Sequence, residues 1–320
     1  MTSTTPDSLS AELPAPPRQA DVFEAPADKV EILDYYPTLR ETLGEAWRSR
    51  TILLQLSITA VTAYFRKYRL GPTWLILQTF MGLIGYTLIF GGGVFNVRAP
   101  NGMPYFLFTM VGMMGWSLFQ STLQIGARSF LRLRSLVRDI HVPLILVPIA
   151  GSAQAIMRFA LYLIAYVIAV VYYWAAQGRI YAQLQIKYLA LSVLGLFLCA
   201  MLAWGISMWT APLTAHTRDV RMVLKYIIPF WMFVTPVLYP IEHLQGKTRL
   251  VAELNPLSSP VEMAKVGLIG AGSVRLYAAI WSIGLIAAVF ASGVWFMNRF
   301  GQRVVGLTSD LDDDDEDALI

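Results

Sequence analysis

Two long stretches without any charged residue constrain the fold of this chain more than any other feature. Residues 72–92 and 104–127 contain no Asp, Glu, Lys or Arg. A helix rises about 1.5 Å per residue, so about 20 apolar residues cross a hydrocarbon core of about 30 Å. Lipid offers the backbone no hydrogen-bond partner, and such segments must therefore be helical. The pattern predicts an all-α membrane protein.

Four further segments extend this pattern to six predicted transmembrane helices. The six spans are placed at about residues 72–92, 104–127, 156–176, 188–212, 224–240 and 275–298. The fifth is short and contains Pro229, Pro236 and Pro240. Residues 51–65 are also apolar but too short to cross, and we expect them to lie at the membrane surface.

Charge is sparse and unevenly distributed. Only 14% of the 320 residues are charged, whereas a soluble domain carries about 25%. Residues 46–303 hold 22 Lys and Arg but five acids. With the N-terminus inside, the inner segments carry 15 basic residues and the outer segments seven, so both termini are predicted to be cytoplasmic. This composition excludes an ordinary soluble enzyme.

The two ends of the chain differ from its apolar middle. Residues 1–37 contain six prolines, seven acids and no apolar run, which predicts a disordered, acidic, Pro-rich cytoplasmic tail rather than a signal peptide. Residues 304–320 form a second acidic cytoplasmic tail. Residues 38–303 between them are predicted to form one transmembrane domain.

Residues 38–50 have the pattern of an amphipathic N-terminal interfacial helix. Thr38 and Glu41 have the spacing of a capping box. Leu39, Leu43 and Trp47 fall on one helical face, as in helices that lie in a membrane surface. An ordinary packed helix is the alternative.

Residues 128–142, between the second and third spans, predict a basic amphipathic helix on the inner side. Its apolar residues share one face, and the other face carries Arg128, Arg132, Arg134, Arg138 and Asp139. We interpret it as a helix that docks on a soluble partner. The alternative is a solvated loop that only follows the distribution of positive charge.

The outer connection at residues 242–272 is long enough for two short helices. Asn255 and Pro256 precede Ser259, which has capping-box spacing to Glu262. The helix that starts there should end near 270–272 and is about 15 Å long, too short to cross. Two re-entrant half-helices are predicted, with a surface loop as the alternative.

Aromatic side chains in the first, second and fifth spans are candidates for a substrate path. They are Tyr86, Phe90, Phe108, Trp116, Phe119, Tyr226, Phe230 and Phe233. Aromatic faces offer sugar rings an apolar surface that binds ions weakly. Packing between helices or anchoring at the membrane interface is the alternative.

The chain lacks the motifs of an enzyme or of a self-powered transporter. No carboxylate lies mid-span, where ion-coupled carriers place them. There is no G-x-x-x-x-G-K-[ST] phosphate loop, the three histidines lack metal-ligand spacing, and Cys199 is the single cysteine. We therefore predict no catalytic residue, metal or cofactor in this chain, and expect another chain to supply energy.

Five motifs in order resemble ABC-2 permeases. Residues 64–78 (YFRKYRLGPTWLILQ) are similar to the family's entry to its first span, and residues 128–143 to its cytoplasmic connection. Residues 217–221 (TRDVR) resemble its inner turn. Residues 233–240 (FVTPVLYP), and the LNP at 254–256 followed by Glu262, resemble its outer motifs. The resemblance covers about residues 40–300, and its nearest branch is the polysaccharide, O-antigen and teichoic-acid exporters.

The resemblance implies a permease subunit of an ATP-driven exporter in the bacterial inner membrane. It implies a homodimer with two ABC ATPase subunits, which hold the ATP and magnesium, and no nucleic-acid partner. Residues 128–142 would be the coupling helix and 242–272 the outer gate. The residues carried over are Arg218, Asp219 and Arg221 at the inner turn and Asn255, Pro256, Ser259 and Glu262 at the gate.

The same resemblance implies the cargo. It would be a lipid-linked polysaccharide, such as an O-antigen, a cell-wall glycan or a teichoic-acid-like polymer, that moves along the dimer interface. Export of a drug, haem or a simple lipid is an alternative within the same fold. A membrane-embedded glycan-processing enzyme is a remote alternative from another class.

Overall fold

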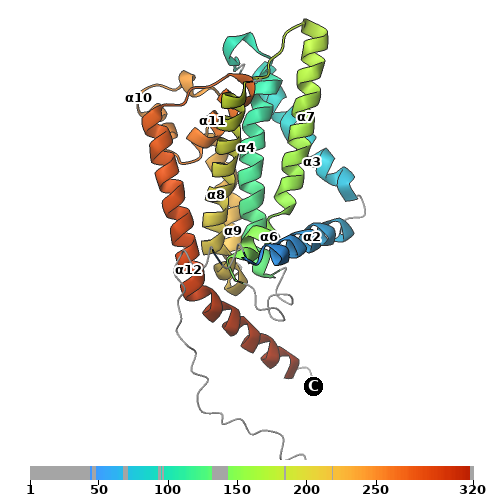
Figure 1. Ribbon diagram of the computed structural model, residues 1–320, viewed down its shortest axis with the longest axis vertical. Helices are drawn as coiled ribbons and strands as arrows, with labels where there is room; N and C mark the ends of the chain where they lie inside the picture. The colour runs from blue at the N-terminus through green and yellow to red at the C-terminus, as the bar shows by residue number, and fades with distance from the viewer. Residues whose placement is uncertain are drawn as a thin grey trace, which may run out of the picture. The chain divides into compact units, whose positions relative to one another are not determined.

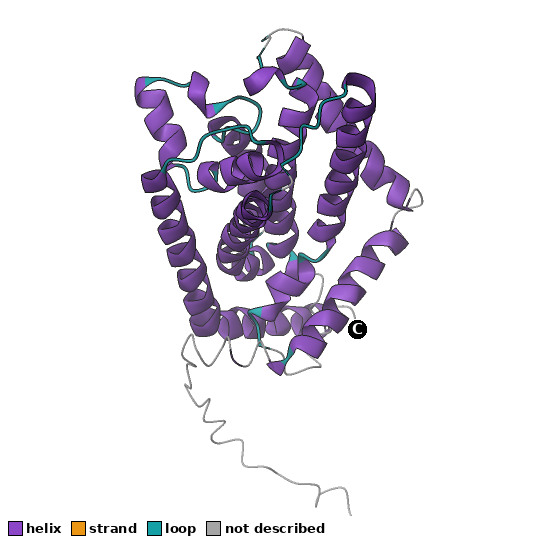
Figure 2. Cartoon of the chain, turned by 45° about the horizontal axis from the view of Figure 1, so that its top comes forward, coloured by secondary structure: helices purple, strands orange, loops and turns teal. Residues whose placement is uncertain are grey.

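A computed structural model describes residues 44, 48–67, 71–92, 95, 97–131, 143–183, 185–217 and 219–317. These residues form helices and loops, and no strand occurs in this part of the chain (Figure 2). They belong to one structural unit, residues 37–320. The predicted all-α fold is confirmed for the described residues.

Among the described residues, four helices are long and apolar enough to cross a membrane. The first is α3 (Gly71–Tyr86), which continues as a π-helix, η2 (Thr87–Gly92). The others are α7 (Gln154–Gln177), α8 (Ile186–His216) and α12 (Leu276–Asp317). They coincide with the first, third, fourth and sixth predicted spans.

The second and fifth predicted spans are occupied by helices of a different kind. α4 (Tyr105–Gly126) has 22 residues, 16 of them buried, and carries Ser, Thr, Gln and Gly. It is not among the four candidates, and it packs against other helices over most of its length. α9 (Asp219–Val234) has only 16 residues and ends before Pro236. The count of six spans therefore stays a prediction.

Helix α4 lies at the centre of the helical unit. It packs against α7, α8 and α11 (Ser258–Ile269), and α12 packs along α8. In Figure 1, α4, α7, α8 and α12 stand side by side. The largest buried cluster is built around Leu107, Phe108, Trp116 and Phe119 of α4.

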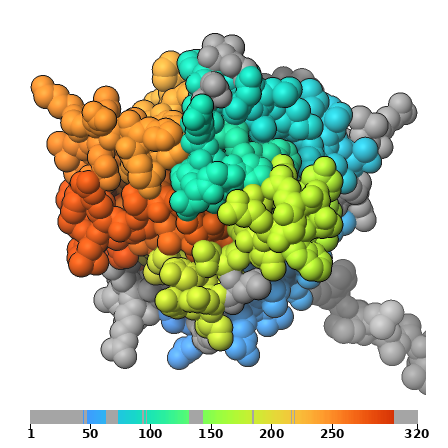
Figure 3. All heavy atoms as spheres, turned by 90° about the horizontal axis from the view of Figure 1, so that it is seen from above, coloured from blue at the N-terminus to red at the C-terminus, as the bar shows by residue number. Residues whose placement is uncertain are grey.

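One end of the unit carries short helices, the first from the loop between η2 and α4 and the others from the predicted outer connection. They are the 3-10 helices η3 (Pro100–Gly102) and η4 (Ile241–His243), and the α-helices α10 (Gly246–Leu254) and α11. Figure 3 looks onto this end and shows the orange segment that contains α10 and α11 beside the red start of α12. Two short helices thus lie where the outer connection predicts them, and their re-entry into a membrane stays a prediction.

The opposite end is crossed by α2 (Arg50–Lys67). Figure 1 shows it below α7, transverse to the upright helices. It packs on α6 (Leu146–Gly151), and Gln154 at the start of α7 donates a hydrogen bond to the Ala60 carbonyl. α2 is not among the four candidate spans. Its predicted place at the membrane surface stays a prediction, and of residues 38–50 the structure describes only 44 and 48–50.

The predicted C-terminal tail is helical over most of its length. α12 continues beyond the predicted end of the sixth span and reaches Asp317. Figure 1 shows it change direction at the lower end of the unit. Residues 1–37, the predicted N-terminal tail, lie outside the described residues.

Candidate functional site

Helix α11 carries an ion pair between two buried side chains, Glu262 and Lys265. Lys265 Nζ lies 3.1 Å from Glu262 Oε1, and the two side chains are 0% and 1% exposed. The ammonium also donates to the Pro236 carbonyl and lies 4.1 Å from the centre of the Phe108 ring of α4. Glu262 Oε2 accepts the Ser273 N–H at 3.1 Å. Both charges are thus matched by partners from surrounding segments, as buried charges require.

Asn255 joins the end of α9 to the start of α11. Its Oδ1 accepts hydrogen bonds from Trp231 Nε1 at 3.0 Å and from the Leu257 N–H at 3.1 Å, and its Nδ2 donates to Thr235 Oγ1 at 2.9 Å. The predicted outer motifs at 233–240 and 254–256 are therefore in direct contact. An amide side chain can make all of these contacts because it donates and accepts hydrogen bonds at once.

The predicted capping box at Ser259 is wrong. α11 begins at Ser258, its N-cap Leu257 makes no side-chain cap, and the Glu262 carboxylate turns inward to Lys265 and Ser273 instead. The predicted end of this helix is confirmed, because Gly270 is its left-handed C-cap with φ 64°. Ser259 is buried, and Pro256 lies between α10 and α11.

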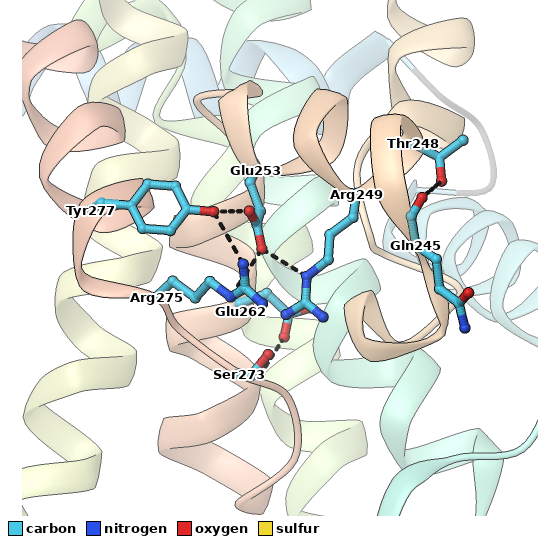
Figure 4. Close-up of polar contacts among 8 residues, drawn as sticks. All are labelled: Gln245, Thr248, Arg249, Glu253, Glu262, Ser273, Arg275 and Tyr277. Carbon is cyan, nitrogen blue, oxygen red and sulfur yellow. Dashed lines mark hydrogen bonds and ion pairs between the residues drawn. The ribbon is translucent and has the colours of Figure 1, made fainter.

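A second polar cluster lies at the same end and surrounds Glu253 of α10. Arg249 Nε is 2.8 Å and Arg275 Nε 3.3 Å from Glu253 Oε1, and the Tyr277 hydroxyl donates to Oε2. Figure 4 shows these three side chains converging on Glu253. Burial acts to raise the pKa of Glu253, but the hydrogen bonds from Tyr277 and Arg249 and the charge of Arg275 outweigh it and lower that pKa. The cluster ties α10 to the start of α12.

A cavity of about 300 Å³ lies between α3, α4, α7 and α9. Its lining combines amide, hydroxyl and guanidinium groups with aromatic rings and methionines. The lining residues are Gln78, Thr79, Gly82, Tyr86, Met113, Trp116, Ser117, Gln120, Arg158, Tyr162, Pro229 and Met232. The volume is at the lower end of the range for small-ligand sites. Arg158 is the one charged residue among the described ones that line the cavity.

The Arg158 guanidinium is held between two other helices. Its Nη1 donates to Ser121 Oγ of α4 at 3.0 Å, and its Nη2 to Gln78 Oε1 of α3 at 3.3 Å. Both partners are neutral, and the described residues that line the cavity include no carboxylate. In the sequence, Arg158 shows only as a cation near one end of an apolar segment. Its partners could not be found from the sequence, because they lie on two other helices.

The structure separates the predicted aromatic path into four groups. Tyr86 and Trp116 line the cavity, and Trp116 Nε1 donates to Gln120 Oε1 at 3.0 Å. Phe108 and Phe119 are fully buried in the core. Phe90 stacks on Phe95, with ring centroids 4.9 Å apart. In the single chain the aromatic residues of the first two spans therefore do not form one continuous surface.

The aromatic residues of α9 form the fourth group and face outward. Tyr226, Phe230 and Phe233 are 64%, 79% and 54% exposed. We call these three side chains the α9 face. Only Ile228 and Met232 of this helix are buried.

Most of the predicted inner-side residues lie outside the described part of the chain. These are Arg132, Arg134, Arg138 and Asp139 of the predicted coupling helix and Arg218 of the inner turn. Arg128 is exposed after the end of α4, Asp219 is the first residue of α9, and Arg221 lies in the first turn of α9. The described residues contain no group of three or more His, Cys, Asp or Glu side chains placed to hold a metal ion.

Comparison with known proteins gives a match over the part of the chain that contains these sites. A family model described as ABC-2 type transporter matches residues 52–269, which is more than half of the chain. The chain belongs to the ABC-2 type transporter family. The match runs from α2 to the last residue of α11, so it includes the cavity, the α9 face and both outer motifs.

A curated relative is the O-antigen export system permease protein RfbA of Myxococcus xanthus. It is 24% identical to this chain over 217 residues, which cover 67% of this chain and 79% of the relative. The resemblance seen in the sequence motifs is therefore confirmed. The chain is an ABC-2 permease, a multi-pass membrane transport subunit of an ABC exporter, and its family pairs with ABC ATPase subunits.

Proposed function

We propose that this ABC-2 permease exports a lipid-linked polysaccharide from the cytoplasmic side of a bacterial inner membrane. The observation that carries the proposal is its similarity to an O-antigen export permease over 67% of the chain. Two copies of the chain would assemble with two ABC ATPase subunits. Those subunits would bind the ATP and magnesium, for which this chain has no phosphate loop.

The chemistry of the cavity supports a sugar-containing cargo. Sugar rings need hydrogen-bond partners around their edges and apolar surface against their faces. The cavity offers both, because Gln78, Gln120 and Tyr162 supply amide and hydroxyl groups while Tyr86 and Trp116 supply rings. A purely hydrophobic drug could not form hydrogen bonds with the donor and acceptor atoms of these groups that face the cavity.

The α9 face supports a dimer in which the path lies between two copies. Aromatic side chains on a helix surface can face lipid, a partner or a substrate, and this helix has few other contacts to hold it. Pro229 and Met232 of α9 also line the cavity. A second copy placed against α9 would therefore bring two cavities and two aromatic faces to one interface.

We derive the transport step from these positions. ATP-driven closure of the ATPase subunits would push residues 128–142, the predicted coupling helix, which follow α4 directly. α3 and α9 would then shift at the interface between the two copies, which opens the path. The glycan would slide past the aromatic rings while its lipid follows within the membrane, and the α10–α11 region would close the outer end as a gate.

The proposal is tested by isolating the native complex through an affinity tag on this chain. Mass analysis should find two copies of the permease, two ATPase subunits and a polyprenyl-linked glycan. Bound haem, drug or phospholipid as the sole cargo would contradict the assigned substrate. Processing of a polyprenyl-linked sugar by the permease alone would instead favour the enzyme alternative.

Docking of the ATPase is tested separately by charge reversal. Arg132→Glu with Arg138→Glu should weaken co-purification of the ATPase subunits, because these residues carry the basic face of the predicted coupling helix. Lys247→Glu, on the exposed surface of α10 at the other end of the unit, is the matched control. Normal assembly and ATP hydrolysis in the double variant would show that the docking assignment is wrong.

A further inference from the structure

We propose that Arg158 is the centre of a binding site for the phosphate group of a lipid carrier. The site comprises Arg158 of α7 with Gln78 of α3 and Ser121 of α4, and it opens into the cavity between these helices. This proposal rests on the proposed function, since it names the part of the cargo that the cavity would hold.

The position of Arg158 fits the headgroup of a lipid in the inner leaflet. It is the fifth residue of α7, so it lies about 6 Å along the helix from its start. Ser121 lies in the last two turns of α4, and α4 runs in the opposite direction. Both residues thus lie near the end of the unit that α2 crosses, where lipid phosphates enter from the predicted cytoplasmic side.

The direction of the guanidinium argues for a ligand rather than for solvent. A charged side chain in a span is costly, and an arginine without a role there extends its head to the membrane surface. Arg158 instead donates sideways to Ser121 and Gln78 on two neighbouring helices. These contacts fix the head at the cavity wall.

The charge balance of the site selects an anion. A guanidinium has five N–H donors, and the contacts to Ser121 and Gln78 engage Nη1 and Nη2 with one neutral acceptor each. None of the described residues that line the cavity carries a carboxylate to neutralise the charge. Phosphate oxygens accept two parallel hydrogen bonds from arginine, so a phosphate ester would match both the charge and the geometry.

The neighbouring groups extend the site toward a sugar. Tyr162 and Gln120 line the same cavity as Arg158, and Tyr86 and Trp116 line it farther along α3 and α4. A phosphate at Arg158 would therefore place the attached sugar among amides, hydroxyls and rings. This order of groups matches a lipid-phosphate-sugar junction better than it matches a bare phospholipid.

The experiment uses the full permease–ATPase complex in nanodiscs of neutral lipid. Four probes are compared: a polyprenyl diphosphate, the polyprenol of the same chain length, phosphatidylglycerol and inorganic diphosphate. The wild type should bind the polyprenyl diphosphate at least about tenfold more tightly than each of the other three. Equal binding of the polyprenol would overturn the phosphate site. Equal binding of phosphatidylglycerol or of inorganic diphosphate would overturn the assignment to a lipid carrier.

The variants separate a binding role from a structural one. Arg158→Gln should weaken polyprenyl diphosphate binding about tenfold or more and leave polyprenol binding unchanged, whereas Arg158→Lys should lie between. Arg179→Gln, an exposed arginine after the other end of α7, is the matched control and should behave as wild type. If Arg158→Gln weakens binding of the diphosphate and of the polyprenol equally, the residue has a structural role. That result would overturn the proposal. Gln78→Leu provides a second test with the charge retained, and it should weaken only the diphosphate probe.

Failure of this inference can be told from failure of the proposed function. If the native complex carries a lipid-linked glycan but Arg158→Gln binds the diphosphate probe normally, only the phosphate site is wrong. If the native complex carries a different cargo, the proposed function is wrong and this inference falls with it.

Discussion

Two short helices, α11 and α9, differ in how much of each is buried against the rest of the permease. Eleven of the 12 residues of α11 are buried, whereas only two of the 16 residues of α9 are buried. α11 is also tied down through Lys265, Glu262 and Asn255. α9 instead leaves Phe230 79% exposed.

This difference indicates which part of the permease can move. Packed interiors transmit displacement as rigid bodies, so α11 should follow α4 and α8 in any rearrangement. α9 is held at its end, where Trp231 and Thr235 contact Asn255, and can shift along the rest of its length at low cost. We therefore expect the outer gate to move with the core, and the substrate path to open at α9.

The largest effect is expected when the buried charge of α11 is removed. Lys265→Met should lower the free energy of unfolding by about 3–5 kcal/mol, because Glu262 is left as an unpaired buried charge. Chemical unfolding of the purified permease in detergent would measure it.

The double variant Glu262→Gln with Lys265→Met should recover part of that loss, since both charges are then gone. Lys247→Met on the exposed surface of α10 is the control and should change stability by less than about 0.5 kcal/mol. A Lys265→Met variant as stable as this control would show that the ion pair does not hold α11.

The next effect concerns the close packing of α11 on α8. A Cβ atom at Gly267 would lie 2.4 Å from the Tyr188 carbonyl oxygen, so Gly267→Ala must push the two helices apart. The expected cost is about 1–3 kcal/mol, measured by the same unfolding experiment. Gly284→Ala in α12 is the matched control, because a Cβ there meets nothing within 4 Å and should be neutral or slightly stabilising. Equal effects of the two substitutions would refute the tight α8–α11 contact.

A smaller effect is expected at Glu253, which links α10 to α12. Tyr277→Phe removes a hydrogen bond to the carboxylate and should cost about 1 kcal/mol at neutral pH. Because the native pKa of Glu253 is lowered, its contribution is present above the unfolded pKa and is lost as the pH falls through the native value. The stability difference between wild type and variant should therefore narrow in acid. A difference that widens in acid would contradict the direction of this pKa shift.

The smallest effect on stability, with a large effect on transport, is expected at the α9 face. Phe230→Ala should change the unfolding free energy of the single chain by less than about 0.5 kcal/mol, since the ring is exposed. Export of the proposed glycan cargo should nevertheless fall sharply. Phe119→Ala in the core is the contrasting variant and should cost about 3–5 kcal/mol. If Phe230→Ala destabilised the chain as much as Phe119→Ala, α9 would be part of the packed core.

The positions of the helices were largely predictable, because the apolar runs are long. Helices α7 and α8 begin within two residues of the predicted starts of their spans, and Gly270 ends α11 as expected. α4 was predicted as a span like the others, and that stays a prediction, but a count of apolar residues does not reveal that most of this helix is buried against other helices.

The polar sites were less predictable, since they depend on contacts between helices. Glu262 fits a capping box and an ion pair to Lys265 equally well by spacing, and only the burial of α11 decides between them. Arg158 was visible as a cation in a span, but its partners Gln78 and Ser121 come from two other helices. Likewise, Phe108 and Trp116 share a face of α4, yet only Trp116 reaches the cavity.

Transport in proteoliposomes that contain the permease and its ATPase subunits would test the proposed function. The lipid-linked polysaccharide is supplied on the side where the ATPase subunits lie, and its arrival on the other side is measured. We predict transport that requires ATP and that is lost in Phe230→Ala without loss of assembly. Transport by the permease alone, driven by a proton gradient and without ATP, would contradict the proposed function.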